Sequence, residues 1–450
     1  MRHLQHLVVL GQLWACTAPG PTRPTPRTEE AADPRTVAAI PVAQARTWFA
    51  EARALCAADD GRTWGVSLCG PMMLVDPKTR AVVASQADAR GRLREQGGVF
   101  VGALDTRDNA ANTSVVWSGV RWIQVLWPLP EDPARRAILI MHESFHRIAE
   151  QLPIGHGDAA DNVHLDTLDG RYYLQLEWRA LAAALRAGSD GARRAATAEA
   201  LAFRQARRAA CPGSGPAEDD LELHEGLAEY TGVVVGLADA AARVDAALRD
   251  LADGSQAPSF VRSFAYATGP ALGLLLDHEA PGWRGAIAGT RSLSGALAAA
   301  LAALAVPLPT PERAAAAYGG AALRDAEQLR AAERASAIRR HLERLVDGPV
   351  ATLRFVHMRI AFDPRAVQSI GAAGTVYPVL RVVDDWGVLE VTGGALIKPD
   401  GSAVVVPAPA PPTIAGGRIA GDGWTLILAP GWTLEPDARP GDLVLARAGR

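Results

Sequence analysis

Two histidines four positions apart, with a glutamate beside the first, are the most informative feature of the sequence. The run reads His142-Glu143-Ser144-Phe145-His146. In a helix, residues at i and i+4 lie on one face, so both imidazoles could bind one metal ion. Glu143 would then lie next to that ion, where a carboxylate can take a proton from a metal-bound water. The pattern therefore predicts a Zn2+ site with Glu143 as the general base.

The residues around this motif carry the signals of a buried helix. Asp132 and Pro133 fit an N-cap and a first helical position, and Pro153 marks a stop. Between them the segment is apolar on nearly every side, which is typical of a helix inside a protein. A buried histidine pair needs polar partners. Two core histidines hydrogen-bonded to backbone carbonyls are the alternative to a metal site.

A catalytic zinc site usually takes a third protein ligand and keeps one position open for water. Five later residues could supply that ligand: His156, Asp158, Asp161, Glu177 and Glu225. The metzincin arrangement is excluded, because it requires glycine at 149 and histidine at 152. The chain has Ala149 and Leu152 at these positions.

Glu225 is favoured because its surroundings resemble a known motif. The segment Leu223-His224-Glu225-Gly226-Leu227-Ala228-Glu229-Tyr230 resembles the second motif of the gluzincin superfamily of zinc metallopeptidases. There a glutamate in an N-E-G-x-A-x-Y setting completes H-E-x-x-H. His224 replaces the usual asparagine. The resemblance covers roughly residues 110–280 and implies that His142, His146 and Glu225 bind zinc. Small residues beside Glu225 would let its helix approach the first helix closely.

The resemblance implies further roles. Glu229, one turn after Glu225, could orient a ligand histidine by accepting a hydrogen bond. Tyr266 is the first choice for stabilising the oxyanion of the tetrahedral intermediate, with His224 and His278 as alternatives. An ordinary packed aromatic is the competing interpretation of Tyr266. The strand 120–127 would be the cleft-edge strand along which an extended substrate pairs, with tryptophans that belong to the core rather than to a substrate pocket.

Two departures separate the chain from the aminopeptidase-type members of the superfamily. His146 and Glu225 are 79 positions apart, which an inserted helical pair around residues 172–208 would explain. The exopeptidase motif G-x-M-E-N is absent from the sequence. A specificity for free amino termini therefore does not follow.

The first residues of the chain are typical of a targeting segment rather than of part of a folded domain. Residues 1–16 resemble a bacterial signal peptide that ends in a lipobox, with Cys16 as the lipidated residue. Residues 17–40 are rich in proline and threonine and suit a linker. We expect secretion across the inner membrane as a periplasmic or outer-membrane lipoprotein, with an extracellular protein as the alternative. Cys56 and Cys69 are close enough in the sequence to form a disulfide in an oxidising compartment. Cys211 would then have no cysteine partner.

The rest of the chain predicts an α+β protein in two domains. Residues 41–348 are expected to form a zincin-like metallopeptidase domain, in which a small mixed sheet precedes a helical bundle that carries the zinc site. The expected strands are 64–68, 72–75, 81–84, 99–101 and one longer strand from 115 to 127. The expected helices are 41–57, 134–152, 170–187, 191–208, 221–251, 260–278, 293–305 and 311–345. Residues 349–450, rich in valine, threonine and glycine, are expected to form a β-rich C-terminal domain.

The bulk composition limits the partners. The 450 residues carry a net charge of −3, which gives no basic footprint for nucleic acid. No later apolar stretch has the length of a membrane span, so a membrane contact is expected only through the N-terminal lipid. The sequence therefore predicts a zinc-dependent hydrolase, a metallopeptidase acting on a peptide or protein substrate. The alternatives are a zinc-stabilised binding or envelope-scaffold protein without catalysis, and a helical scaffold without metal.

Overall fold

The computed structural model describes residues 40–105, 108, 110–154, 162–362, 367–409 and 417–447. The predicted signal peptide with Cys16 lies outside these ranges, as do nearly all of the predicted linker and the candidate ligands His156, Asp158 and Asp161. The chain has two compact units, which divide between Leu329 and Arg330, inside helix α12. Each unit has its own hydrophobic core and is described separately.

The first unit begins with helix α1 (Val42–Asp59) and a six-stranded mixed sheet. Its strands, in spatial order, are β3 (Arg94–Gln96), β4 (Val99–Ala103), β2 (Ala81–Ala84), β1 (Met72–Val75), β6 (Val120–Leu126) and β5 (Thr113–Trp117). β1 and β6 are parallel, and the other neighbours are antiparallel. The predicted strand at 64–68 is wrong, since these residues form turns and irregular chain.

The predicted long strand from 115 to 127 is also wrong, because it is a hairpin. Strands β5 and β6 pair with Val115 opposite Trp122, and a two-residue turn joins them. Ser118 and Gly119 both have positive φ angles, of 48° and 81°. Such angles belong to the tight hairpin turn whose twist matches that of the flanking strands. The turn makes β5 an edge strand of the sheet.

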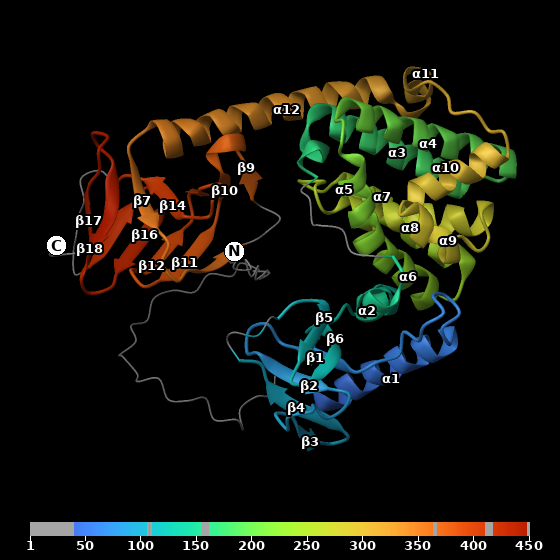
Figure 1. Ribbon diagram of the computed structural model, residues 1–450, viewed down its shortest axis with the longest axis horizontal. Coiled ribbons are helices and arrows are strands. Elements are labelled where there is room, and N and C mark those ends of the chain that lie inside the picture. Colours follow the sequence, from blue (N-terminus) through green and yellow to red (C-terminus); the bar gives the residue numbers. More distant parts are fainter. Residues whose placement is uncertain are drawn as a thin grey trace. The chain divides into compact units, whose positions relative to one another are not determined.

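Helices follow the sheet up to the end of the first unit (Figure 1). They are α2 (Pro133–Ile148), α3 (Leu168–Arg186), α4 (Asp190–Ala210), α5 (Gly215–Leu221), α6 (Leu227–Gly236), α7 (Ala240–Ser255), α8 (Phe264–Glu279), α9 (Trp283–Thr290), α10 (Leu293–Ala303), α11 (Pro311–Ala315) and α12 (Gly320–Leu342). One turn of π-helix, Glu222–Gly226, joins α5 to α6 and is called the π-turn below. The single helix predicted over 221–251 is therefore broken, since α6 ends at Gly236 and Asp239 caps α7 through the backbone N–H of Ala242.

The second unit is β-rich, as the composition predicts. One sheet has the order β17 (Trp432–Pro436), β18 (Leu443–Arg447), β7 (Val350–Arg354), β14 (Ala403–Pro407), β13 (Ala395–Ile397), β10 (Thr375–Tyr377) and β9 (Gln368–Ser369). The other has the order β15 (Arg418–Gly421), β16 (Trp424–Leu428), β12 (Gly387–Val391), β11 (Leu380–Asp384) and β8 (Arg359–Phe362). Buried residues of both sheets form one core, as in a β-sandwich.

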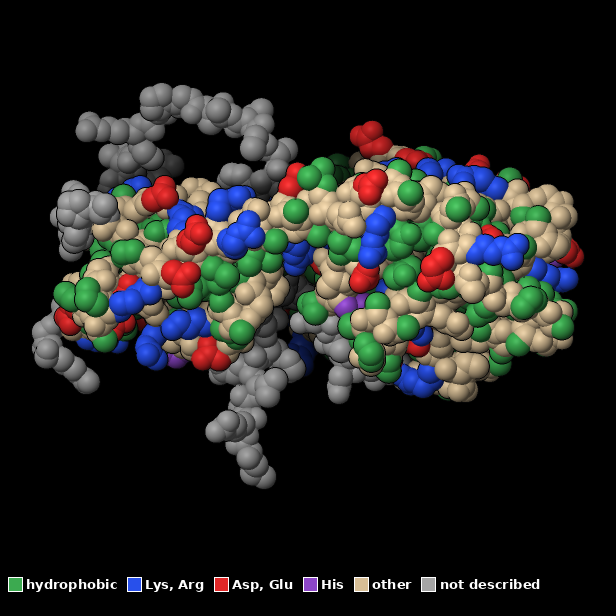
Figure 2. All heavy atoms as spheres, turned by 90° about the horizontal axis from the view of Figure 1, so that it is seen from above, with side chains coloured by type: hydrophobic (Ala, Val, Ile, Leu, Met, Phe, Trp, Pro, Cys, Tyr) green, Lys and Arg blue, Asp and Glu red, His purple; other side chains and the backbone are tan. Residues whose placement is uncertain are grey.

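The surface and the helix lengths give two further observations. Figure 2 shows one face of the molecule, on which arginine and acidic side chains of the described residues are interspersed. Among the described helices, none alone is long and apolar enough to cross a membrane. The pair α9 and α10, bent by 112°, passes this test together on length and composition only.

Candidate metal centre

The histidine motif lies on α2, which begins and packs as its sequence predicts. The side chain of Asp132 accepts a hydrogen bond from the backbone N–H of Ala134 at 2.9 Å, and Pro133 is the first helical residue. The helix lies between strands β5 and β6 on one side and helix α6 on the other (Figure 1). It is buried by both layers, which explains why it is apolar nearly all round.

Three side chains converge at this helix and could hold a metal ion: His142, His146 and Glu225. The two histidine Nε2 atoms are 3.1 Å apart. The Glu225 carboxylate oxygen Oε2 lies 3.6 Å from Nε2 of His142 and 3.4 Å from Nε2 of His146. Two ligand atoms bound about 2.0–2.2 Å from a tetrahedral zinc ion lie roughly 3.3–3.6 Å apart. The three atoms thus match one face of a tetrahedron of ligands.

The carboxylate of Glu229 orients the imidazole ring of His142. Nδ1 of His142 donates to Oε2 of Glu229 at 2.6 Å, which directs Nε2 of the same ring toward Glu225. Burial alone would lower the pKa of His142. Hydrogen bonds to the carboxylates of Glu225 and Glu229 outweigh burial and raise this pKa to about 10. The raised pKa means that Nε2 of His142 carries a proton, and a metal ion that binds this nitrogen would have to displace it.

Glu143 is buried in the same site with one oxygen unused. Glu143 is 3% exposed, and its Oε2 atom has no hydrogen-bond partner among the described residues. Burial raises the pKa of Glu143 to about 8. A dication bound beside it would favour the carboxylate and lower that pKa. A buried carboxylate oxygen without a partner is costly unless something binds it, which makes Glu143 available to a water or a substrate.

Of the three oxyanion candidates, Tyr266 and His224 lie at the site and His278 does not. The ring of Tyr266 stacks parallel to that of His142, with centroids 5.6 Å apart. Partial burial and the nearby Glu225 carboxylate raise the pKa of Tyr266, which is 38% exposed, so its hydroxyl stays protonated. The His224 ring lies 4.8 Å from that of His146. His278 is a half-exposed residue at the end of α8, 3.6 Å from Asp190.

A pocket of about 440 Å³ opens over these residues. Its lining includes Asn112, Thr113, Ser114, Arg121, Leu139, Ala149, Glu150, His224, Glu229 and Tyr266 besides His142, Glu143, His146 and Glu225. The strand along the pocket is therefore β5, with β6 behind it, which corrects the prediction that 120–127 is the cleft-edge strand. The hairpin explains the difference, because it places β5 outside β6. Of the two tryptophans in 120–127, Trp122 is buried and Trp127 packs, partly buried, against the core, and neither lines the pocket, as the sequence predicts.

Some pocket residues were not singled out by the sequence. Arg121 and Glu150 form an ion pair at 2.8 Å within the lining. Glu150 follows His146 by four positions, so helical spacing alone could have placed it on the metal-facing side. Asn112 and Ser114 could not be found in this way, because their position depends on the hairpin. The Oγ atom of Ser114 is buried and has no hydrogen-bond partner in the part of the chain that the structure describes.

Close approach of helices depends on glycines, though not as predicted. Gly226, next to Glu225, contacts α8 rather than α2, since a Cβ on Gly269 would lie 2.3 Å from the Gly226 Cα. The approach to α2 is made later on α6. A Cβ on Gly232 would lie 2.6 Å from the Ile138 carbonyl oxygen. The contact of the π-turn with α8 brings Tyr266 and Glu225 together.

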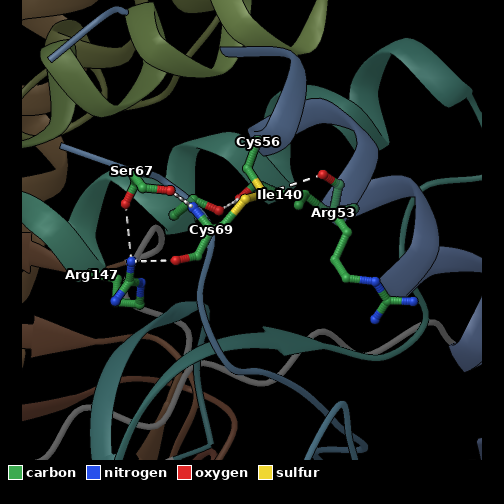
Figure 3. The surroundings of a disulfide bond; sticks show 7 residues. Arg53, Cys56, Ser67, Cys69, Ile140 and Arg147 are labelled. Carbon is green, nitrogen blue, oxygen red and sulfur yellow. Dashed lines mark hydrogen bonds between the residues drawn. A yellow bond between two sulfur atoms is a disulfide. The ribbon is translucent and has the colours of Figure 1, made fainter. Parts of the chain in front are cut away.

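The back of the metal helix is held by a disulfide-linked loop (Figure 3). Cys56 of α1 and Cys69 are bonded, and the loop that contains Cys69 leads into β1. Arg147, directly after His146, donates from Nη2 to the carbonyl oxygens of Ser67 at 3.1 Å and Cys69 at 2.6 Å. Among the described cysteines, Cys211 is free. The disulfide thus connects α1 to a loop to which Arg147 of α2 is hydrogen-bonded.

Glu177, the other described candidate for the third ligand, lies elsewhere. Its side chain is 1% exposed and bonds to Arg204 and Arg207 of α4. These contacts exclude Glu177 from the histidine pair. Comparison of the chain with protein families, with curated proteins and with solved structures found no match. The functional argument therefore rests on the geometry of the site.

Proposed function

We propose that the chain is a zinc-dependent hydrolase and that it cleaves peptide bonds. The observation that carries the proposal is the set of three distances, 3.1, 3.4 and 3.6 Å, between two imidazole nitrogens and one carboxylate oxygen. Two histidines and one glutamate form a ligand set found in catalytic zinc sites, which keep a fourth position for water. Glu143 beside them supports catalysis, because a purely structural site needs no such base.

The residues of the pocket then take distinct roles. A zinc ion held by His142, His146 and Glu225 would supply Lewis-acid activation of a water and of the scissile carbonyl. Glu143 accepts the proton of that water and later returns it to the leaving amine. Tyr266 donates a hydrogen bond to the oxygen on which negative charge develops. Glu229 keeps the His142 ring in the orientation that its partners require.

The edge strand beside the pocket supports a peptide as the substrate. Among the described strands, β5 pairs with β6 alone, so the backbone groups of its outer edge are available for pairing within this part of the chain. An extended peptide can add to such an edge by main-chain hydrogen bonds, which act on any sequence. Asn112, Thr113 and Ser114 of this segment line the pocket. The scissile bond of a paired peptide would pass over the histidines.

We further infer a zincin-like core and an extracytoplasmic location. A mixed sheet with its edge at the pocket, followed by one helix with two histidines and a later helical turn with a glutamate, supports the first inference. The Cys56–Cys69 disulfide supports the second, because disulfides persist in oxidising compartments. Attachment to a membrane by lipid at Cys16 is part of the same proposal.

Metal analysis and one isosteric variant test the function. We expect purified wild-type protein to contain stoichiometric zinc and to cleave a mixed peptide library. Glu143→Gln should retain the metal and lose activity by about 10²–10⁴-fold, because it lacks only the base. His146→Ala should lose both. The Arg193→Gln variant, altered in an ion pair away from the pocket, serves as the control that keeps both properties.

The outcomes separate the proposal from its rivals. Zinc without cleavage of any peptide would support a metal-stabilised binding or scaffold protein. Protein without metal, even after exposure to zinc, would overturn both zinc interpretations. Equal activity in wild-type protein and Glu143→Gln would rule out the assigned base.

A further inference from the structure

A network of buried charges lies next to the π-turn and outside the pocket. It joins Glu177 of α3, Arg204 and Arg207 of α4, Glu218 of α5 and Glu222 of the π-turn. Each of these side chains is at most 3% exposed, and none lines the pocket. Helices α3 and α4 run side by side in this region (Figure 1). The proposed chemistry makes no use of the network.

Arg204 is the central member of this network. Its Nη1 and Nη2 atoms donate to the two oxygens of Glu222 at 2.7 and 2.6 Å. Its Nε and Nη2 atoms also donate to Oε1 of Glu177, at 2.9 and 2.6 Å. A bidentate pair of this kind determines both the distance and the direction between two groups. Arg204 therefore connects the π-turn rigidly to α3 and α4.

Stability alone is a weak reason for such a network. Desolvation of buried ions can outweigh their mutual attraction, and apolar side chains of similar volume often serve as well. Hydrogen-bonded charges do impose one defined geometry, whereas apolar packing is non-directional and allows small shifts between the elements in contact. The element that receives this geometry is the π-turn, in which the N–H of Leu227 bonds to the carbonyl oxygen of Glu222.

The π-turn determines where Glu225 points. A π-turn holds one residue more than an α-helical turn, so it changes the direction of the side chains that it carries. Glu225 lies three residues after Glu222, within the same turn. On its other side the turn touches α8 through Gly226 and Gly269. The turn is thus held between Arg204 and α8.

We propose that Arg204 is a positioning residue for the metal site. Through Glu222 it keeps the π-turn in the register that brings the Glu225 carboxylate to 3.4 Å from Nε2 of His146. The proposal rests on the proposed metal-dependent function. It adds that the third ligand depends on a buried ion pair that touches neither the metal nor the substrate.

Two substitutions test the proposal in the full-length protein. Glu222→Gln removes one charge of the pair at constant shape. Arg204→Lys keeps the charge but removes the bidentate geometry. Three quantities are measured: the affinity for zinc by chelator competition, the absorption spectrum of the cobalt-substituted protein, and the amide hydrogen exchange of the π-turn. We expect both variants to lose roughly 10- to 100-fold in zinc affinity. We also expect an altered cobalt spectrum and faster exchange at Leu227.

Glu279 provides a matched control. Its fully buried carboxylate also accepts from arginines of α4, at 3.1 Å from Arg193 and 2.8 Å from Arg194. It lies at the far end of α8 and does not line the pocket. Glu279→Gln should lower the midpoint of thermal unfolding and leave the zinc affinity, the cobalt spectrum and the exchange at Leu227 unchanged.

Each result has a defined meaning. Wild-type affinity and spectrum in both test variants would overturn the proposal, and so would an equal loss of affinity in Glu279→Gln. If Glu222→Gln does not fold, Arg204→Lys decides, because it preserves the charge balance. A wild-type protein that binds no metal would refute the proposed function instead. In that case exchange at Leu227, faster in the test variants than in the control, still decides whether Arg204 positions the turn.

Discussion

At the scale of single residues, the site combines groups whose protonation a metal ion would change. The pKa of His142 is raised to about 10 by its carboxylate partners against the effect of burial, and burial raises that of Glu143 to about 8. At neutral pH the protein without metal therefore holds protons on both groups. A zinc ion bound at this site would compete with the proton on His142 for the ring nitrogen. The occupancy of the site should depend on pH.

The first prediction concerns this competition. The folded-state pKa of His142 lies above its ordinary value of 6.5, so its pairing stabilises the metal-free protein fully below pH 6.5. That stabilisation is lost as the pH rises through about 10. The apparent zinc affinity should change in the opposite direction and rise with pH across this window. Chelator competition over this range measures it, and a pH-independent affinity would contradict the assignment.

Tyr266 gives the second prediction at this scale. Tyr266→Phe keeps the ring that stacks on His142 but removes the hydroxyl. Loss of one oxyanion donor should lower kcat by about 10²–10³-fold with the zinc content unchanged. Tyr318→Phe is the control, because the Tyr318 hydroxyl bonds to Glu199 and does not line the pocket. Equal kcat in Tyr266→Phe and wild-type protein would return Tyr266 to a packing role.

At the scale of elements, the close contact between the π-turn and α8 allows packing at the site to be tested. Gly269→Ala would place a Cβ 2.3 Å from the Cα of Gly226, where only backbone atoms could move. We expect a loss of about 1–3 kcal/mol in the free energy of unfolding. Weaker zinc binding should accompany it, because the turn carries Glu225. Denaturant titration and chelator competition measure the two effects.

A glycine with free space around it provides the comparison. A Cβ added to Gly285 of α9 would meet no atom within 4 Å. Gly285→Ala should therefore be neutral or stabilise the protein by about 0.5–1 kcal/mol, because alanine loses less backbone entropy in a helix. If both variants behave alike, the close helix contact has no energetic importance.

At the scale of the whole molecule, two units with separate cores predict two unfolding events. The metal site lies entirely in the unit Glu30–Leu329. Zinc at about 100 times its Kd should stabilise that unit by roughly 2.7 kcal/mol and leave the β-rich unit unchanged. Calorimetry of the full chain should show one transition that moves with zinc and one that does not. A single transition, or movement of both, would contradict this independence.

Much of the candidate metal centre could be predicted from the order of the residues. The spacing of His142 and His146, the cap at Asp132 and the apolar flanks are local signals, and local signals act through helix geometry alone. Glu225 was preferred among several candidates because its surroundings resemble a known motif, whose residues are also close together in the sequence. The mixed sheet before the helices and the β-rich end of the chain were predicted from periodicity and composition. These features can be predicted without knowing which helices and strands are in contact in the folded protein.

The remaining features depended on contacts between segments far apart in the chain. The edge position of β5 depends on the pairing of β6 with β1, in which Met72 lies opposite Ile123. The turn at Ser118 and Gly119 is by contrast a local signal, which the predicted single strand missed. The partner of Gly226 is α8 instead of α2, because helix packing is chosen by the whole interior. Arg204 and Glu222 lie on different helices, so their pairing has no signature in spacing. Residue order thus indicated three residues that could bind a metal ion, while packing between distant helices established the direction in which Glu225 points.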